Sequence, residues 1–128
     1  MLPTEQKLIA YIHKRGARTK LHICGNATPL LPYLTKTNSD IIDIDHLVDL
    51  GQAVEVLGDG QYVSGNFDPV SILLQGTTDD VRKAVAHCMK IGKDKLFVSA
   101  GCEVPKFTPP ENLKAVEEAL WANSSSFM

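Results

Sequence analysis

Short apolar segments alternate with amphipathic segments along this sequence, and this alternation constrains its fold more than any other feature. The apolar segments lie at residues 19–24, 40–44, 61–65 and 95–100, and a helical pattern follows each of them. They are short and apolar rather than strictly alternating, which is typical of parallel strands covered by helices. A further helix is expected over residues 4–15, before the first strand. The pattern predicts an α/β fold in which four parallel strands alternate with helices.

Helix start and stop signals support this order of elements. The pair Thr28-Pro29 is an N-cap followed by proline at the first helical position. Thr77 and Asp80 resemble a capping box, and the apolar stripe of the helix that follows them includes Cys88, which is expected to be a small core residue. The predicted helices after the strands cover residues 28–36, 47–57, 77–92 and 108–120.

Right-handed units of this kind build either an open sheet or a closed barrel, and periodicity alone does not choose between them. No G-x-G-x-x-G or phosphate-loop sequence follows any strand, so a nucleotide-binding open sheet gains no positive support. The chain has 128 residues, which suits one domain. A complete (β/α)8 barrel usually needs about 250 residues.

Composition and charge exclude several classes of function. Charged residues make up 22% of the chain, the net charge is -2, and basic residues are interleaved with acidic ones, so nucleic-acid binding is not expected. The apolar runs are short and residues 1–7 lack a signal-peptide core, so no membrane role is expected. The three cysteines show no disulfide-type spacing, which indicates a reducing, cytoplasmic setting.

The strongest chemical signal comes from the ends of the first and last predicted strands. His22 and Cys24 are two residues apart and share one face of a strand. Cys102 follows the last strand, and both strand ends lie at the same mouth of a parallel sheet. One imidazole and two thiolates suit zinc and leave a fourth position open for a substrate. The alternative is two ordinary buried cysteines and a strand histidine, and ligand types alone do not decide between these readings.

Several longer motifs carry a resemblance to a known family. They are His22-Ile23-Cys24-Gly25-Asn26, the segments 65–70 and 76–77, Ser99-Ala100-Gly101-Cys102-Glu103-Val104-Pro105, and Thr108-Pro109-Pro110-Glu111-Asn112-Leu113. Together they resemble the C-terminal half of the uroporphyrinogen decarboxylase superfamily, over about residues 4–122. Within it, the histidine, the cysteine two residues later and the distant Gly-Cys pair are similar to the zinc signature of the methylcobamide:thiol methyltransferases. The decarboxylases proper usually have Gly-His where this chain has Gly101-Cys102.

The resemblance implies a zinc-dependent methyltransferase, or its metal-bearing half. Zinc held by His22, Cys24 and Cys102 would favour the thiolate form of a substrate thiol such as coenzyme M. The methyl group would come from a methylcobamide on a corrinoid partner protein. Two alternatives are a decarboxylase of tetrapyrrole side chains, which needs no metal, and a catalytically silent fragment that serves as an assembly partner.

Three further polar residues are candidate catalytic groups, because each lies where a strand ends at the predicted mouth. Asp45 follows the second strand. Either Asp45 or Asp43, at the end of that strand, can orient His22 or contact substrate, and Asp45 can instead cap the next helix. Asn66 and Asp68 follow the third strand, and the resemblance places this turn near the active site. Their alternative role is to bind loop backbone before Pro69.

The resemblance begins in a helix that would precede the fifth strand of a full barrel. Residues 1–122 are therefore expected to form the C-terminal half of a (β/α)8 barrel, and residues 123–128 a flexible tail. Four parallel strands with open edges expose unpaired backbone and part of what would be a barrel interior. The sequence predicts association with a complementary N-terminal half-barrel or with a second copy of the chain.

Overall fold

The computed structural model describes residues 1–124 of the chain. The strands are β1 (Lys20–Ile23), β2 (Ile41–Ile44), β3 (Tyr62–Phe67) and β4 (Leu96–Ala100). The helices are α1 (Leu2–His13), α2 (Leu31–Thr35), α3 (Leu50–Glu55), α4 (Thr78–Gly92) and α5 (Pro110–Ser124). Short turns of 3-10 helix lie at η1 (Thr28–Leu30) and η3 (Lys93–Lys95), and one π-helical segment, η2, spans Pro69–Leu74.

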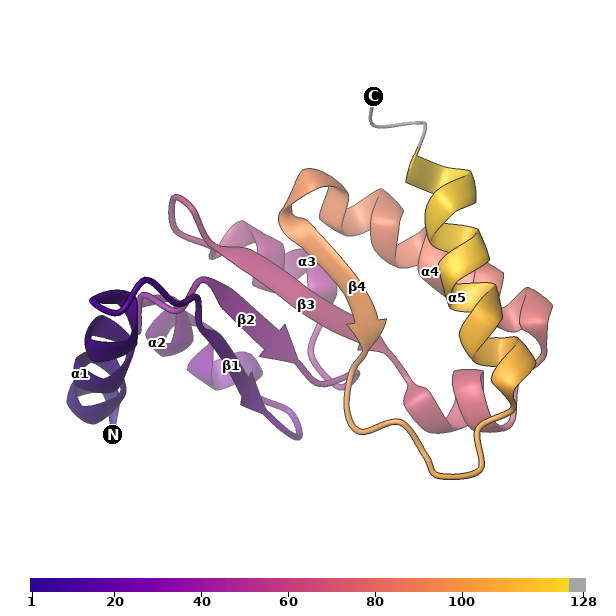
Figure 1. The fold of residues 1–128 in the computed structure, drawn as a ribbon, viewed down its shortest axis with the longest axis horizontal. Helices are drawn as coiled ribbons and strands as arrows, with labels where there is room; N and C mark the ends of the chain where they lie inside the picture. The colour runs from indigo at the N-terminus through magenta and orange to yellow at the C-terminus, as the bar shows by residue number, and fades with distance from the viewer. Residues whose placement is uncertain (125–128) are drawn as a thin grey trace.

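The four strands form one parallel sheet in the order β1-β2-β3-β4 (Figure 1). Each strand therefore pairs with its neighbour in sequence, and a helix makes each return connection. The register aligns His22 with Asp43, and Asp43 with Ser64. The predicted succession of parallel strands and helices is confirmed.

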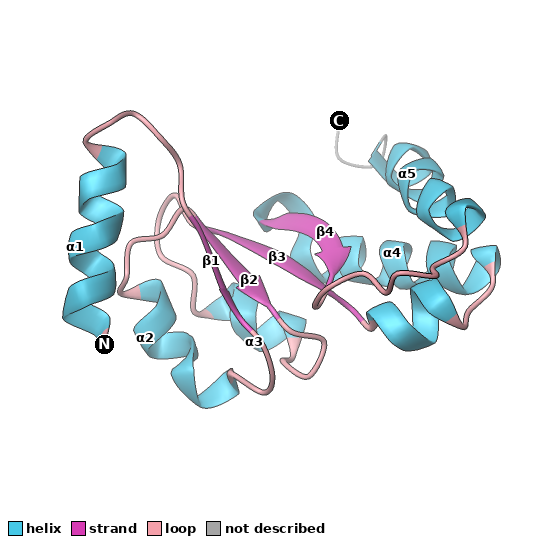
Figure 2. Ribbon diagram, turned by 60° about the horizontal axis from the view of Figure 1, so that its bottom comes forward, coloured by secondary structure: helices cyan, strands magenta, loops and turns pink. Residues whose placement is uncertain are grey.

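The two faces of the sheet differ in chemistry. Alternate strand residues such as Ile42, Ile44 and Val63 are at most 1% exposed, because they pack against helices. Helices α2, α3 and α4 lie behind the sheet in Figure 1, and Figure 2 shows the same arrangement from another side. The opposite face is open within residues 1–124, so the aromatic side chains of Tyr62 and Phe97 remain 37% and 53% exposed.

Helix α4 forms where its local signals predict. The Thr77 hydroxyl accepts a hydrogen bond from the Asp80 amide, and the Asp80 carboxylate accepts one from the Thr77 amide. Val81 and Val85 are fully buried and Cys88 is 4% exposed, as expected for the apolar stripe. Both the capping box and the core position of Cys88 are confirmed.

Three local predictions differ from the structure. Strand β3 continues to Phe67, so Asn66 lies within the strand instead of following it. A π-helical turn follows at η2, which the sequence pattern did not predict. Helix α3 begins at Leu50, and its N-cap is Asp49, whose carboxylate accepts the Gln52 amide, so Asp45 is not the cap. For β3 and η2, contacts with neighbouring segments outweigh the local signal, whereas at α3 one local cap, Asp49, replaces another.

The C-terminal helix extends slightly beyond the predicted domain boundary. Helix α5 reaches Ser124 and so includes the first two residues of the predicted tail, while residues 125–128 lie outside the described part of the chain. None of the helices within residues 1–124 has the length and apolar character that a membrane crossing requires.

Candidate metal centre

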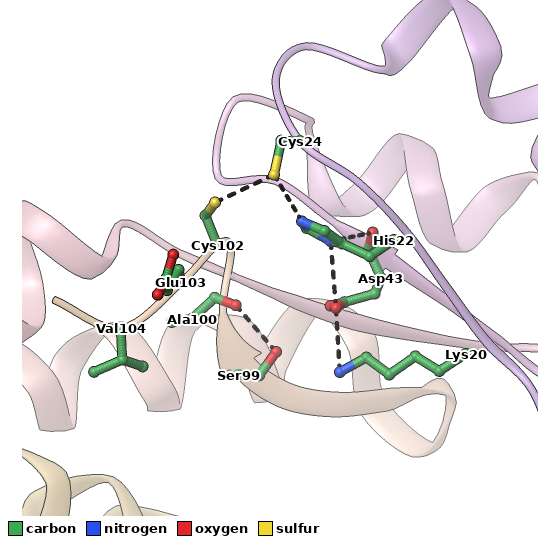
Figure 3. Close-up of a pocket in the computed structure, with 9 residues that line it drawn as sticks. All are labelled: Lys20, His22, Cys24, Asp43, Ser99, Ala100, Cys102, Glu103 and Val104. Atoms are coloured by element: carbon green, nitrogen blue, oxygen red, sulfur yellow. Dashed lines mark hydrogen bonds and ion pairs between the residues drawn. The ribbon is translucent and has the colours of Figure 1, made fainter. Parts of the chain in front are cut away.

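Strand β1 presents the first two predicted ligands on the open face of the sheet. His22 lies within the strand and Cys24 directly after it, so their side chains point the same way. The His22 Nε2 atom lies 3.0 Å from the Cys24 Sγ atom. The predicted common orientation of these two side chains is present in the structure (Figure 3).

The loop after β4 brings Cys102 to the same point. Its Sγ atom lies 3.4 Å from the Cys24 Sγ, although 78 residues separate the two cysteines. The ligand atoms of His22, Cys24 and Cys102 all lie within 4.8 Å of one another. Curvature of the sheet therefore unites the tips of its first and last strands (Figure 3).

The donor set fits zinc in type and spacing. Ligand atoms around tetrahedral zinc lie about 3.5–3.8 Å apart when two are thiolate sulfurs and one is an imidazole nitrogen. The distances of 3.0 and 3.4 Å are slightly shorter, so the three side chains need only a small outward movement to hold the ion. Two thiolates balance the charge of Zn²⁺, and three protein ligands leave a fourth position for a substrate.

Asp43 on the neighbouring strand β2 contacts the Nδ1 side of the His22 ring. The Nδ1 atom lies 3.1 Å from the Asp43 carbonyl oxygen and 3.3 Å from its Oδ2 atom. Contacts at Nδ1 leave Nε2 directed toward the cysteines, which is how histidine ligands of metals are usually oriented. The Asp43 carboxylate also pairs with the Lys20 ammonium group at 3.2 Å. Its second oxygen is buried and has no hydrogen-bond partner among residues 1–124.

The Cys24 thiol holds its proton tightly when no cation is bound. The hydrogen bond with Cys102 raises the pKa of the Cys24 thiol, and partial desolvation and nearby negative charge raise it further. A bound metal ion has the opposite effect, because its charge favours the thiolate. Metal binding and loss of protons from these cysteines are therefore coupled.

The three candidate catalytic residues bind backbone, and within residues 1–124 only Asp45 among them contacts a residue next to a candidate ligand, Gly25. Asp45 is 4% exposed and accepts hydrogen bonds from the Gly25 and Leu47 amides at 2.8 and 3.0 Å. Asn66 donates to the Asp45 carbonyl, and Asp68 accepts the Val70 amide at the start of η2. Burial raises the pKa of Asp45, but the Gly25 and Leu47 amides outweigh it and the net pKa is lowered. A catalytic role for the three stays a prediction.

The cluster opens into a cavity of about 530 Å³ on the open face of the sheet. Its lining consists of Lys20, His22, Cys24, Asp43, Ser99, Ala100, Cys102, Glu103 and Val104 (Figure 3). Sequence reasoning did not single out Lys20 or Ser99. Lys20 precedes His22 by two residues and so shares its face of the strand, a signal that was available from the sequence.

Comparison with known proteins identifies the family. The family model described as uroporphyrinogen decarboxylase (URO-D) matches residues 1–121, nearly the whole chain. The chain belongs to the URO-D family. This result confirms the resemblance inferred from the motifs, and it covers the strands that carry all three candidate ligands.

The relatives that match this chain include both methyltransferases and decarboxylases. The methylcobamide:CoM methyltransferase MtbA of Methanosarcina acetivorans is 35% identical over 117 residues, which are 91% of this chain and 34% of that protein. A uroporphyrinogen decarboxylase of Prochlorococcus marinus is 31% identical over 120 residues, or 91% of this chain and 33% of its own length. The chain therefore spans about a third of the length of these relatives.

A solved structure supports the fold assignment. A methyltransferase from Methanosarcina mazei superposes with a TM-score of 0.85 at 26% identity, over 97% of this chain and 36% of that one. The URO-D family chain thus has the fold of a partial (β/α)8 barrel, with four parallel strands that alternate with helices, and the predicted fold class is confirmed.

Proposed function

We propose that this chain is the zinc-bearing part of a methyltransferase that moves a methyl group from a corrinoid protein to a small thiol. One observation carries the proposal: the ligand atoms of His22, Cys24 and Cys102 lie within 4.8 Å of one another at the carboxyl ends of the strands. In (β/α)8 enzymes this end of the barrel is where active sites form. The relatives named as methylcobamide:CoM methyltransferases support the same proposed function.

The protein side chains would hold the ion and fix its open position. Cys24 and Cys102 supply two thiolates, and His22 supplies one imidazole nitrogen. Asp43 keeps the His22 ring oriented from the neighbouring strand. When bound, zinc would supply the positive charge that converts a substrate thiol to a thiolate, the form that accepts a methyl group.

The polar residues beside the cluster are proposed to shape the mouth of the site. Asp45 fixes the turn at Gly25, directly after the ligand Cys24. Asn66 in turn binds the backbone of Asp45, and Asp68 secures the start of η2 near His46. We assign these three candidate catalytic residues to the approach path of thiol and corrinoid, because they lie at the carboxyl ends of β2 and β3, the same edge of the sheet as the ligands.

The open face of the sheet is proposed to be completed by other strands. Tyr62 and Phe97 expose aromatic surface there, and a cavity of about 480 Å³ lies beside them. A complementary N-terminal half-barrel would cover this face and pair with the edges of β1 and β4, and a second copy of the chain is the alternative. Size-exclusion chromatography with light scattering tests this: a stable monomer at low concentration would contradict it. The free cysteines suit a reducing cytoplasm.

Metal analysis of the purified protein tests the central proposal. We expect about one zinc ion per chain, as in a catalytic site with three protein ligands. Cys102→Ser, Cys24→Ser and His22→Gln should each remove most of it. Cys88→Ser is the matched control, because Cys88 is buried in the core on α4 and should leave the zinc content unchanged. Equal zinc loss in all four variants would contradict the site.

Methyl transfer from methylcobalamin to coenzyme M, with the complementary half of a relative supplied, tests the activity itself. The second candidate is decarboxylation of tetrapyrrole side chains, which the uroporphyrinogen decarboxylase relatives favour. That reaction needs no metal. Activity that survives chelation and Cys102→Ser would support decarboxylation, whereas inactivity in both assays would favour the silent assembly fragment.

A further inference from the structure

The two thiols of the candidate metal centre are also placed to react with each other. Their sulfur atoms lie 3.4 Å apart, so a movement of about 1.4 Å would bring them to the usual S–S bond length. Cys24 is exposed and Cys102 is partly exposed, and both line the open cavity. A small oxidant can therefore reach this pair from solvent.

The loops that carry the two cysteines favour this movement. Cys24 follows the end of β1, and Cys102 follows β4 at the start of the long connection to α5. Neither cysteine lies inside a strand or helix, so closing the gap requires a shift of loop residues only. Disulfide formation depends on such local approach more than on separation along the chain.

We propose that Cys24 and Cys102 form a redox-sensitive pair, which a peroxide converts to an intramolecular disulfide when the site is free of metal. This inference rests on the proposed zinc site and adds its regulation. The disulfide would remove two of the three ligands, so oxidation and metal binding would exclude each other. Reduction by a cellular dithiol would restore both ligands.

Hydrogen peroxide is the only reactant that this oxidation needs besides the two cysteines. The Cys24 thiolate, as the more exposed sulfur, attacks one peroxide oxygen; the O–O bond breaks, hydroxide leaves, and a sulfenic acid remains on Cys24. The Cys102 thiolate then attacks the Cys24 sulfur, forms the S–S bond and expels the second oxygen as hydroxide. The two thiol protons convert both hydroxides to water. Two cysteines are oxidised, and one peroxide is reduced to two water molecules.

The third cysteine provides an internal contrast. Cys88 is 4% exposed on the buried face of α4, where a peroxide in solvent does not reach its sulfur, whereas Cys24 is exposed. A peroxide should therefore leave it unchanged under conditions that oxidise the pair. Selective loss of two thiols out of three is the expected signature.

The test compares zinc-free and zinc-loaded protein after exposure to hydrogen peroxide. In the zinc-free protein, intact mass should fall by about 2 Da as two hydrogen atoms leave, and peptide mapping should join Cys24 to Cys102. Zinc should slow this reaction by about tenfold or more, because the metal occupies both sulfurs. The oxidised protein should bind no zinc until dithiothreitol is added. Cys88→Ser should behave like the natural chain.

Two variants separate the steps. Cys102→Ser should stop at the sulfenic acid on Cys24, which dimedone traps, because the resolving thiol is absent. His22→Gln should lose zinc affinity but still form the disulfide, since it retains both sulfurs. This variant distinguishes failure of the metal site from failure of the redox pair.

The outcomes are distinct. Zinc binding by the reduced protein, combined with over-oxidation of single cysteines or with disulfides between chains, would overturn the redox pair and leave the proposed function standing. No zinc binding by the reduced protein would overturn the proposed function and with it this regulation, even if the disulfide forms. A disulfide that prevents zinc binding until dithiothreitol reduces it would support both the redox pair and the proposed function.

Discussion

Gly101 packs so closely on His46 that a Cβ atom at position 101 would lie 2.2 Å from the His46 backbone nitrogen. The Gly101 amide also donates to the Phe67 carbonyl at 2.8 Å, at the end of β3. These contacts hold the start of the loop that carries Cys102 against the tips of β2 and β3. Absence of a side chain at position 101 is therefore a condition for the ligand cluster.

We expect Gly101→Ala to displace Cys102 and to lower zinc affinity by about tenfold or more, because backbone cannot move aside as a side chain can. The free energy of unfolding should fall by about 1–3 kcal/mol. A chelator competition assay and urea unfolding measure the two effects. Gly51→Ala is the control: the nearest atom to its added Cβ is a side-chain oxygen of Asp49, and zinc affinity should not change. Normal zinc binding by Gly101→Ala would contradict this account.

Asp43 should increase the zinc affinity of the site although it is not a ligand. Asp43→Asn keeps the backbone carbonyl that contacts His22 Nδ1 but removes the carboxylate charge at 3.3 Å. We expect zinc affinity to fall by about 10- to 100-fold with the stoichiometry of the site retained at high zinc concentration. Competition with a chromogenic chelator gives the affinity. Asp49→Asn, which preserves the cap of α3 and does not line the cavity at the ligands, should have no effect. Unchanged affinity in Asp43→Asn would show that the backbone contact alone orients the ring.

The acid stability of the fold should depend on Asp40 at the amino end of the sheet. Burial raises the pKa of Asp40, but the Thr19 amide, the Arg18 guanidinium and the His13 ring lower it more, so the net pKa lies well below its usual range. A carboxylate of this kind stabilises the folded state above its unfolded pKa of about 4, and the contribution is lost as pH falls toward the folded value.

We therefore expect the free energy of unfolding to decrease as the pH is lowered from about 5 to 3. Asp40→Asn should remove part of this decrease and cost about 1–3 kcal/mol at pH 7, because it loses charged hydrogen bonds. Urea unfolding across this pH range measures both effects. Asp59→Asn, at an exposed turn, should follow the natural chain. An unchanged pH profile in Asp40→Asn would contradict the assignment.

Asn112 fastens α5 to the segment after β3. Its side chain is 2% exposed and donates to the carbonyl oxygens of Leu73 and Gly76, each at 2.8 Å. Asn112→Ala would leave one buried and one partly buried carbonyl group without this donor, so we expect a loss of about 1–3 kcal/mol in the free energy of unfolding. Glu111→Ala, at the exposed neighbouring position, should lose less than about 0.5 kcal/mol. Equal stability of the two variants in urea would show that water replaces the Asn112 bonds.

Local sequence signals predicted the order of elements because they act within a few residues. The capping box of Thr77 and Asp80 and the buried stripe through Val81 and Val85 both lie where the pattern placed them. The parallel arrangement also followed from the sequence, since strands joined by helical crossovers return in the same direction. The family motifs further named His22, Cys24 and Cys102 as one set.

Local signals failed where a distant segment decides the conformation. The extension of β3 through Asn66 depends on pairing with Ser99 of β4, and the η2 turn is held from α5 by Asn112. Asp45 has the residue type of a helix cap, but its carboxylate binds the distant Gly25 amide as well as the Leu47 amide, and it does not cap α3. Each of these choices involves residues more than 15 positions apart.

The sequence by itself determined the helices, the strands, their parallel order and the identity of the three candidate ligands. Only the tertiary structure decided that the Cys24 and Cys102 sulfurs lie 3.4 Å apart, that Asp43 rather than Asp45 contacts the His22 ring, and that Gly101 must lack a side chain. The physical reason is that propensity and capping depend on neighbours in the chain, whereas distances between strand ends depend on the twist and packing of the whole sheet.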